Sequence, residues 1–315
     1  MIAGKSGQNR YYCLITLVYM DRWQDYNVRS EIPEVFMDIY FIFKAVVIAI
    51  VEGITEFLPV SSTGHMIIVG DLIGFPETEF TKMFNVVIQL GAILAIVVLY
   101  FNKLMGLLVS LLRGERSGIA FTKALIIGVI PAGILGVLFE DTIDKYLFKP
   151  IPVIIGLFVG AVLLIAVENR FRRKAKTHNV EDITPMQALK VGLFQCLAMW
   201  PGMSRSSSTI MGGWISGLSS SVAAEFSFFL AIPIMLGASL LKLVKFQMEF
   251  GLGSLDSTEL VSFGLGFVVA FIVALVCVKG FVGFVKKRPM RIFAVYRIAL
   301  SIILVLLASF KVVSF

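Results

Sequence analysis

The stretch EGITEFLPVSSTGH at residues 52–65 places two carboxylates, several hydroxyl groups and a histidine inside an otherwise apolar part of the chain. A second polar stretch, QCLAMWPGMSRSSST at residues 195–209, interrupts the apolar sequence again. Charged side chains at membrane depth are costly unless they face a cavity and find partners there. The two stretches therefore predict a functional site inside a membrane protein.

Composition also indicates a membrane protein. With 58% hydrophobic and 16% charged residues, and a mean hydropathy of +0.90, the chain lies outside the range of soluble domains. The net charge of +7 comes from basic residues in short loops between apolar segments, which favours topology signals over nucleic-acid binding. The three cysteines lack metal-ligand spacing and are expected to be packing residues.

Residues 1–36 differ from the rest because they mix charged residues with one apolar run at 11–20. That run is shorter than the roughly 20 residues that a membrane-spanning helix needs, and the segment lacks the pattern of a signal peptide. We expect residues 1–36 to be a leader or an extension, and residues 37–315 to form a single membrane domain.

Six apolar segments are long enough to cross a bilayer as helices. They cover residues 84–101, 119–139, 151–167, 222–244, 260–285 and 292–313. Two further pairs of shorter segments flank the polar stretches, at 39–58 with 66–75 and at 186–200 with 210–218. Irregular backbone at membrane depth survives only when it is buried in protein or lines a wet cavity. Each pair therefore predicts a re-entrant helical hairpin.

Basic residues gather in the loops after the first, third and fifth long segments, which the positive-inside rule places in the cytoplasm. They are Lys103, Arg113 and Arg116; Arg170, Arg172, Arg173, Lys174 and Lys176; and Lys286, Lys287, Arg288 and Arg291. The intervening loops are acidic and belong outside. They contain Glu140, Asp141 and Asp144, then Glu249, Asp256 and Glu259.

The two halves of the chain resemble each other. Aligning Pro59 with Pro201 brings Ser62 onto Ser204 and Gly70 onto Gly212. Each unit is one hairpin plus three spans, so the second unit enters the bilayer upside down. The expected fold is an all-α polytopic membrane protein with an inverted-topology repeat, about 37–167 and 184–315, whose site lies at the repeat interface. The alternative is a chance match between apolar sequences.

Glu52 and Glu56 are four residues apart, so a helix directs both carboxylates to one side. Carboxylate oxygens suit a hard divalent cation such as Mg²⁺ or Ca²⁺, which often bridges phosphate oxygens. The alternative is a pair of acids that is solvated or caps a helix end.

The second polar stretch suits a phosphate. Its hydroxyl groups, backbone amides and one guanidinium precede an apolar helix, and a helix N-terminus attracts anions. The candidate substrate-binding residues are Gly202, Ser204, Arg205, Ser206 and Thr209. The alternative is a serine-rich N-cap with an arginine that reaches to the interface.

His65 is one of two histidines and follows Ser62 by three residues. Near neutral pH a histidine can exchange protons or activate a neighbouring hydroxyl as a nucleophile. We therefore take Glu56, Ser62, His65 and Arg205 as candidate catalytic residues, and expect them to share one chamber. A structural hydrogen-bonding role for His65 is the alternative.

At these residues the chain closely resembles the undecaprenyl-diphosphate phosphatases, also called bacitracin-resistance proteins. The motifs EGITEFLPVSSTGH and PGMSRSSST are long and specific, and the resemblance extends from Met37 to the C-terminus. It implies a bacterial inner-membrane enzyme that removes one phosphate from the C55 isoprenoid diphosphate and recycles this lipid carrier for cell-wall synthesis. It also implies dependence on a divalent cation and resistance to bacitracin. A midplane site could open to either side; because the carrier diphosphate is released on the outer face, we expect access from the periplasm.

Under this hypothesis Glu52 and Glu56 hold the cation, while Arg205 and the hydroxyls of the second stretch bind the phosphates. Sequence leaves open whether His65 activates water or whether Ser62 forms a phosphoseryl intermediate. A polyprenyl-phosphate flippase or transporter is the main alternative, because such proteins also use broken helices at the midplane. A structural scaffold leaves the buried charges unexplained. A homo-oligomer is compatible with the sequence.

Overall fold

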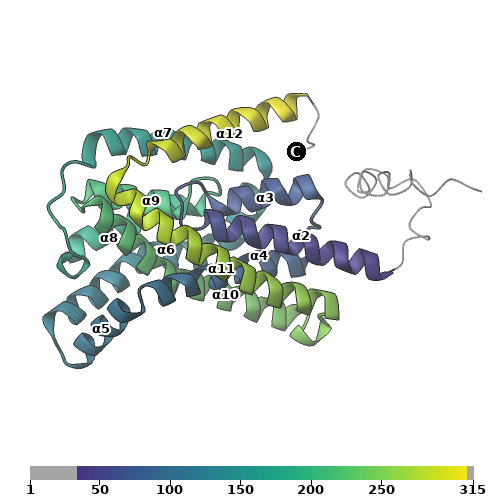
Figure 1. The fold of residues 1–315 in the computed structure, drawn as a ribbon, viewed down its shortest axis with the longest axis horizontal. Coiled ribbons are helices and arrows are strands. Elements are labelled where there is room, and N and C mark those ends of the chain that lie inside the picture. Colours follow the sequence, from purple (N-terminus) through teal and green to yellow (C-terminus); the bar gives the residue numbers. More distant parts are fainter. Residues whose placement is uncertain (1–33, 311–315) are drawn as a thin grey trace, which may run out of the picture.

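The computed structural model describes residues 34–310, which are almost entirely helical (Figure 1). Within that range six helices are long and apolar enough to cross a membrane, so the chain is a polytopic membrane protein. They are α4 (Glu79–Leu99), α6 (Arg116–Leu147), α7 (Pro150–Phe171), α10 (Ser220–Glu249), α11 (Ser257–Lys287) and α12 (Arg291–Ser309).

Four predicted spans, at 119–139, 151–167, 222–244 and 260–285, lie within α6, α7, α10 and α11. The spans at 84–101 and 292–313 lie mostly within α4 and α12 but run past the ends of these helices, at Leu99 and Ser309, and residues 311–313 lie outside the described residues. All six predictions are confirmed as apolar helices. The predicted leader, residues 1–36, lies outside the described residues except for its last three. Those three begin α2 (Glu34–Thr55), so the predicted boundary at Met37 falls in the first turn of a helix.

Two further pairs of helices lie where the hairpins were predicted, and α2, with 22 residues, is as long as the spans. The first pair is α2 and α3 (Ser62–Ile73). The second is α8 (Pro185–Gln195), continued by the 3-10 turn η4 (Cys196–Met199), and α9 (Arg205–Ile215). In the first pair α2 ends at Thr55, and in the second η4 ends at Met199; each of the two loops that follow contains a proline, Pro59 or Pro201.

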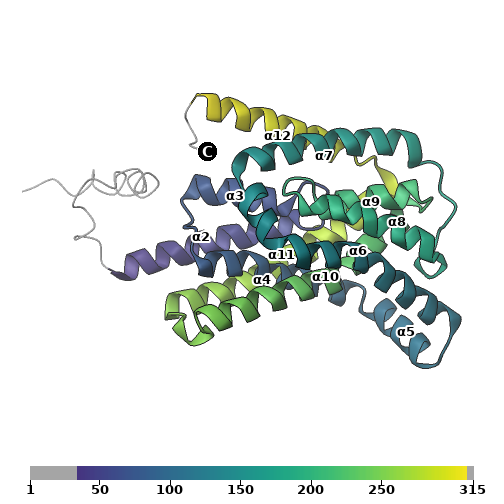
Figure 2. The ribbon, with the colours of Figure 1, turned by 180° about the vertical axis from the view of Figure 1, so that it is seen from behind.

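One helix was not predicted. α5 (Phe101–Leu112) occupies what the sequence suggested was a basic loop around Lys103. In Figures 1 and 2 it projects from one corner of the molecule beside the start of α6. The other short elements are η3 (Val180–Asp182) and η5 (Leu252–Ser254), together with an isolated parallel bridge between Thr177 and Leu218.

Helices from the two halves of the chain interleave. α7 and α12 lie side by side along one edge in both views (Figures 1 and 2), α2 packs against α11, and α4 packs against α10 and α11. Gly53 shows how close the α2–α11 contact is, since a Cβ atom there would lie 2.8 Å from the Ala270 carbonyl oxygen. Small residues permit such close packing between membrane helices. Gly53 therefore lets the part of α2 that carries Glu52 pack directly against α11.

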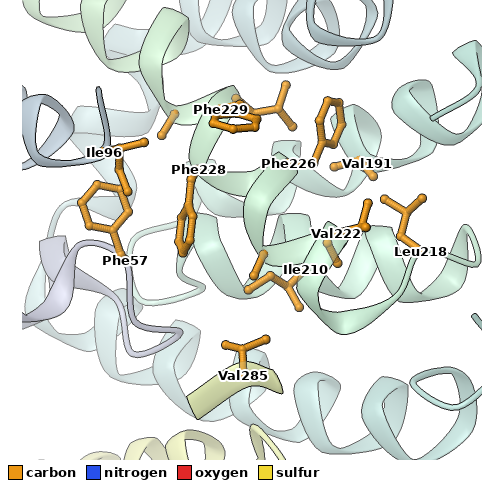
Figure 3. Packing of buried hydrophobic residues seen from close by; sticks show 14 of the residues in the cluster. Phe57, Ile96, Val191, Ile210, Leu218, Val222, Phe226, Phe228, Phe229 and Val285 are labelled. Carbon is orange, nitrogen blue, oxygen red and sulfur yellow. The ribbon is translucent and has the colours of Figure 1, made fainter. Parts of the chain in front are cut away.

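An aromatic cluster supports the first polar stretch from behind (Figure 3). The ring of Phe57, directly after Glu56, meets that of Phe228 edge to face, with 5.5 Å between ring centroids and an interplanar angle of 86°. Edge-to-face pairs of this kind are favourable beyond the area that they bury. Phe57 is completely buried, so it fixes the backbone that carries the Glu56 carboxylate.

Candidate active site

Both loops that follow the helix breaks use the same strained cap. Among the described residues, the non-glycine residues with positive φ are Ser61 (φ 76°) and Ser204 (φ 72°). Such conformations cost on the order of 1–3 kcal/mol each and persist where the surrounding structure imposes them, often at functional sites. Each serine caps the next helix: Ser61 Oγ accepts from Gly64 N at 3.4 Å, and Ser204 Oγ accepts from Ser207 N at 3.3 Å.

Gly202 lets the second loop approach α7 closely. Its φ is 96°, a conformation that favours glycine. A Cβ atom at this position would also collide with the Val153 carbonyl oxygen of α7. The loop is therefore pressed onto α7, with Ser204 and Arg205 directed toward the first loop.

Glu56 joins the two loops. Ser62 Oγ donates a hydrogen bond to Glu56 Oε2 at 2.6 Å, and Arg205 Nη2 donates to Glu56 Oε1 at 3.0 Å. The side chains of the ion pair are only 9% and 3% exposed. Because both charges are buried away from water, removing either one would leave the other as an uncompensated buried charge. One carboxylate thus orients a hydroxyl from its own loop and a guanidinium from the other.

Further contacts hold the Arg205 guanidinium in place. Its Nη1 donates to the Ser227 carbonyl oxygen at 2.8 Å, and its Cζ atom lies 5.9 Å from the centre of the Phe57 ring. Its Nε is buried and has no hydrogen-bond partner among the described residues. The guanidinium keeps donor capacity beyond the ion pair.

These residues border a cavity of about 100 Å³. Its walls are formed by Glu56, Ser61, Ser62, Thr63, Gln89, Ala198, Pro201, Gly202, Ser204, Arg205 and Met235. A water molecule occupies roughly 30 Å³ in the liquid. The cavity is therefore on the scale of a phosphoryl group and far too small for a long isoprenoid chain.

The residues predicted to bind phosphate divide into two groups. Gly202, Ser204 and Arg205 line the cavity. Ser206 and Thr209 are fully buried outside its lining. Ser206 Oγ donates to the Leu58 carbonyl oxygen at 2.8 Å, and Thr209 Oγ1 donates to Ser227 Oγ at 2.7 Å. Through these hydrogen bonds Ser206 and Thr209 stabilise the two loops and the surroundings of Arg205.

His65 lies behind the cavity rather than in its wall. Its Nδ1 is 2.7 Å from the Ser61 carbonyl oxygen, and its Nε2 is 2.8 Å from the Tyr296 hydroxyl on α12. A carbonyl can only accept, so Nδ1 carries the proton in this hydrogen bond. The structure thus brings Glu56, Ser62 and Arg205 together, with His65 holding the residue that precedes Ser62.

Glu52 is completely buried on α2 next to Glu56. No N–H or hydroxyl group among the described residues donates to either of its carboxylate oxygens. Its polar neighbour is the carboxyl group of Glu56. Two buried carboxylates side by side are strongly unfavourable unless a cation or a shared proton offsets their charge, so this side chain fits a role as a cation ligand. The described part of the chain contains no group of three His, Cys, Asp or Glu side chains arranged for a metal, so protein carboxylates supply two ligands at most.

Arg297 is a site residue that the sequence analysis overlooked. It is fully buried on α12, and its guanidinium donates to the carbonyl oxygens of Gly202 at 2.8 Å and Met203 at 3.1 Å. It also reaches the Ser207 hydroxyl at 3.3 Å and the Pro59 carbonyl oxygen at 3.5 Å. The sequence did offer one signal for Arg297: it is the single arginine in the apolar span 292–313, which contains no acidic residue to pair with it. Tyr296, Ser227 and Gln89 were overlooked as well.

The chain is similar to known proteins along most of its length. The family model of bacitracin resistance protein BacA matches residues 45–303. The undecaprenyl-diphosphatase of Clostridium tetani is 54% identical over 273 residues, covering 87% of this chain and 98% of the relative. That of Clostridium perfringens strain SM101 is 52% identical over 306 residues, covering 88% and 99%. Undecaprenyl-diphosphatase 2 of Clostridioides difficile strain 630 is 52% identical over 286 residues, with the same coverage. The chain belongs to the BacA family of bacitracin resistance proteins.

Proposed function

We propose that this chain is an undecaprenyl-diphosphatase, which hydrolyses undecaprenyl diphosphate to undecaprenyl phosphate and inorganic phosphate and so confers resistance to bacitracin. The observation that carries the proposal is the Ser62–Glu56–Arg205 arrangement at the wall of a cavity sized for a phosphoryl group. The names of the three relatives point to the same reaction. The isoprenoid tail lies outside the cavity, among the helices and lipid.

Ser62 is the nucleophile in this proposal. Its Oγ attacks the terminal phosphorus while its proton passes to Glu56 Oε2, which already accepts its hydrogen bond at 2.6 Å. The bond between that phosphorus and the bridging oxygen breaks, and undecaprenyl phosphate leaves with the electron pair. Water then attacks the phosphorus of the phosphoserine and the bond to Oγ breaks. The proton held by Glu56 returns to Ser62 Oγ, and inorganic phosphate leaves with the protons of the water. Splitting the reaction into two easier steps is the usual advantage of a covalent intermediate.

Arg205 stabilises the charge that accumulates on the phosphoryl and leaving oxygens. Preorganised donors in a water-poor site stabilise such a transition state because they need no reorganisation during the reaction. The contacts to Glu56 and Ser227 fix the guanidinium before substrate arrives. Gly202 and Ser204 place the backbone of the second loop beside the same oxygens.

His65 acts as a positioning residue. Its hydrogen bonds to the Ser61 carbonyl and to the Tyr296 hydroxyl connect the strained cap to α12. Because Ser61 precedes Ser62, this connection sets the direction of the attacking hydroxyl. A direct proton transfer from Ser62 to His65 fits the geometry less well, since both ring nitrogens already have other partners.

A divalent cation, Mg²⁺ or Ca²⁺, fits the buried carboxylates of Glu52 and Glu56. When bound, it supplies electrostatic neutralisation of the diphosphate. With two carboxylates from the protein, the remaining ligands would be substrate oxygens and water, as is common for Mg²⁺.

We extend the proposal to the topology of the chain in the membrane, which we infer to be an inverted-topology repeat. One broken helix pair and three long helices occur twice in chain order, and each loop has a positive-φ serine cap. Matching the two caps pairs Ser61 with Ser204, whereas aligning Pro59 with Pro201 pairs Ser62 with Ser204. The two alignments therefore differ by one residue. We place the domain, with repeats of about 37–167 and 184–315, in the bacterial cytoplasmic membrane. The basic loops then face the cytoplasm and the site opens to the outside.

Phosphate release by the purified full chain tests the function. We expect inorganic phosphate and undecaprenyl phosphate in equal amounts from undecaprenyl diphosphate, with activity lost on chelation and restored by added cation. Movement of the headgroup across liposomes without phosphate release would instead identify a transporter and contradict the proposal.

A further inference from the structure

A second, larger cavity of about 320 Å³ lies outside the proposed active site. It is enclosed by the end of α4, the start of α10 and the end of α11. Its lining consists of Leu99, Tyr100, Ser221, Ala224, Glu225, Phe228, Lys279, Val282, Val285 and Lys286. Phe228 lines this cavity, and its ring also packs against that of Phe57, the residue after Glu56 (Figure 3). The proposed reaction uses none of these residues.

Positive charge is in excess around this cavity. Lys279 and Lys286 are seven residues apart on α11, so they lie on one face of the helix, roughly 10 Å apart along its axis. Neither has an ion-pair partner within residues 34–310. The one carboxylate in the wall, Glu225, already pairs with Lys103 at 2.8 Å. Lys103 is also 3.8 Å from Glu181. A ligand that neutralises the two free ammonium groups would therefore be favoured.

The remaining walls suit an amphiphile. Leu99, Val282 and Val285 provide apolar surface, while the hydroxyls of Tyr100 and Ser221 can donate hydrogen bonds to a phosphate. The cavity lies at the helix ends that adjoin the basic loops, which the positive-inside rule places in the cytoplasm. Basic pockets between membrane helices on the cytoplasmic side are suited to anionic lipid head groups.

We propose that this cavity binds the head group of an anionic phospholipid from the cytoplasmic leaflet. The diester phosphate lies between Lys279 and Lys286, and the upper part of one acyl chain packs on Leu99 and Val282. The site is independent of the hydrolytic site, so its occupancy does not require Ser62, Glu56 or Arg205.

Lipid retention by the purified full chain tests this proposal. Native mass spectrometry is performed with phosphatidylglycerol and with phosphatidylcholine of identical acyl chains. We expect preferential retention of phosphatidylglycerol, reduced about tenfold or more in Lys279→Gln/Lys286→Gln, because each lysine near an anionic head group contributes appreciably to binding. Lys287→Gln is the matched control, since Lys287 is exposed beside Lys286 but does not line the cavity.

Three results would overturn the proposal. The first is equal retention of the two lipids by the wild-type chain, which needs no variant and so does not depend on folding. The second is an equal loss of retention in Lys287→Gln. The third is complete displacement of phosphatidylglycerol by millimolar inorganic phosphate, which would identify a site for a free anion. Thermal unfolding in detergent verifies that each variant is folded.

Discussion

Arg205 and Glu56 form a buried ion pair between residues 149 positions apart in the chain, with Nη2 3.0 Å from Oε1. The arginine begins α9 and the glutamate follows α2, so this contact brings the two broken helices to one cavity. Removing one member of a buried pair is costly because the other charge loses its partner. The ion pair is both a structural link and the centre of the proposed chemistry.

Arg205→Lys tests the planar donor group. Lysine keeps the charge but cannot bond Glu56 and Ser227 at once, and we expect turnover to fall about 10²–10³-fold, the loss typical for a transition-state donor. Phosphate release at saturating substrate measures it. Arg170→Lys, in an exposed position at the end of α7, serves as the control and should behave like the wild type. Near-wild-type turnover of Arg205→Lys would show that the planar donor group is not required.

Ser62→Ala should abolish phosphate release and the formation of phosphoserine. Brief incubation with substrate labelled in the terminal phosphate, followed by acid quenching and peptide mapping, should place the label on Ser62 in the wild-type chain. Thr63→Ala is the matched control because Thr63 also lines the cavity but makes no hydrogen bond to Glu56 within the described chain. Oxygen incorporation from water without any labelled enzyme would exclude the covalent route.

His65 and Tyr296 should act as one unit. We expect His65→Ala to lower turnover more than substrate affinity, and Tyr296→Phe to cause a smaller loss of the same kind. Residues in direct contact are non-additive, so the double variant should be no slower than His65→Ala. Fully additive losses in kcat would show that the hydrogen bond between Nε2 and the hydroxyl has no part in positioning.

Arg297→Gln should destabilise the whole domain. It leaves buried carbonyl groups of both loops without a donor, and each unsatisfied group costs about 1–3 kcal/mol. We expect the thermal transition in detergent to fall by several degrees, together with activity. Arg291→Gln, exposed at the start of the same helix, should leave the transition unchanged. An unaltered transition in Arg297→Gln would mean that the loops are held by other contacts.

Glu52→Gln addresses the cation. If Glu52 is a ligand, the variant should need a higher concentration of Mg²⁺ or Ca²⁺ for half-maximal activity, because one charged ligand is lost. Glu79→Gln, a surface substitution at the start of α4, should not alter this concentration. The same cation titration for Glu52→Gln and the wild type would exclude Glu52 as a ligand.

The sequence contained enough information for the spans and the helix breaks. Twenty-residue apolar segments have few alternatives to a helix in a membrane, and the polar stretches at 52–65 and 195–209 mark where the helices are interrupted. α5 was missed because its 12 residues are too few to span a bilayer, and Lys103 with the nearby Arg113 and Arg116 suggested a basic loop. Its helical conformation depends on its position beside α6, which composition does not encode.

The site could be predicted in part. Motif residues that are close in sequence, such as Glu56 and Ser62, were expected together, and the structure pairs them. The partners of His65 were not foreseeable, because Tyr296 lies 231 positions away. Arg297 also belongs to a distant helix. Spacing along one loop reveals which side chains share a helix face, but not which side chain another helix delivers to them.

The most direct test of the account is a double-mutant cycle between Glu56 and Arg205 in the phosphate-release assay. Values of kcat/KM are measured for the wild type, Glu56→Gln, Arg205→Lys and the double variant, with thermal unfolding as a check on folding. Because the two groups act as a unit, we expect each single change to cause a large loss and the double variant to be no worse than the poorer single variant. Losses that simply add in free energy would contradict the central claim that the two broken helices make one site.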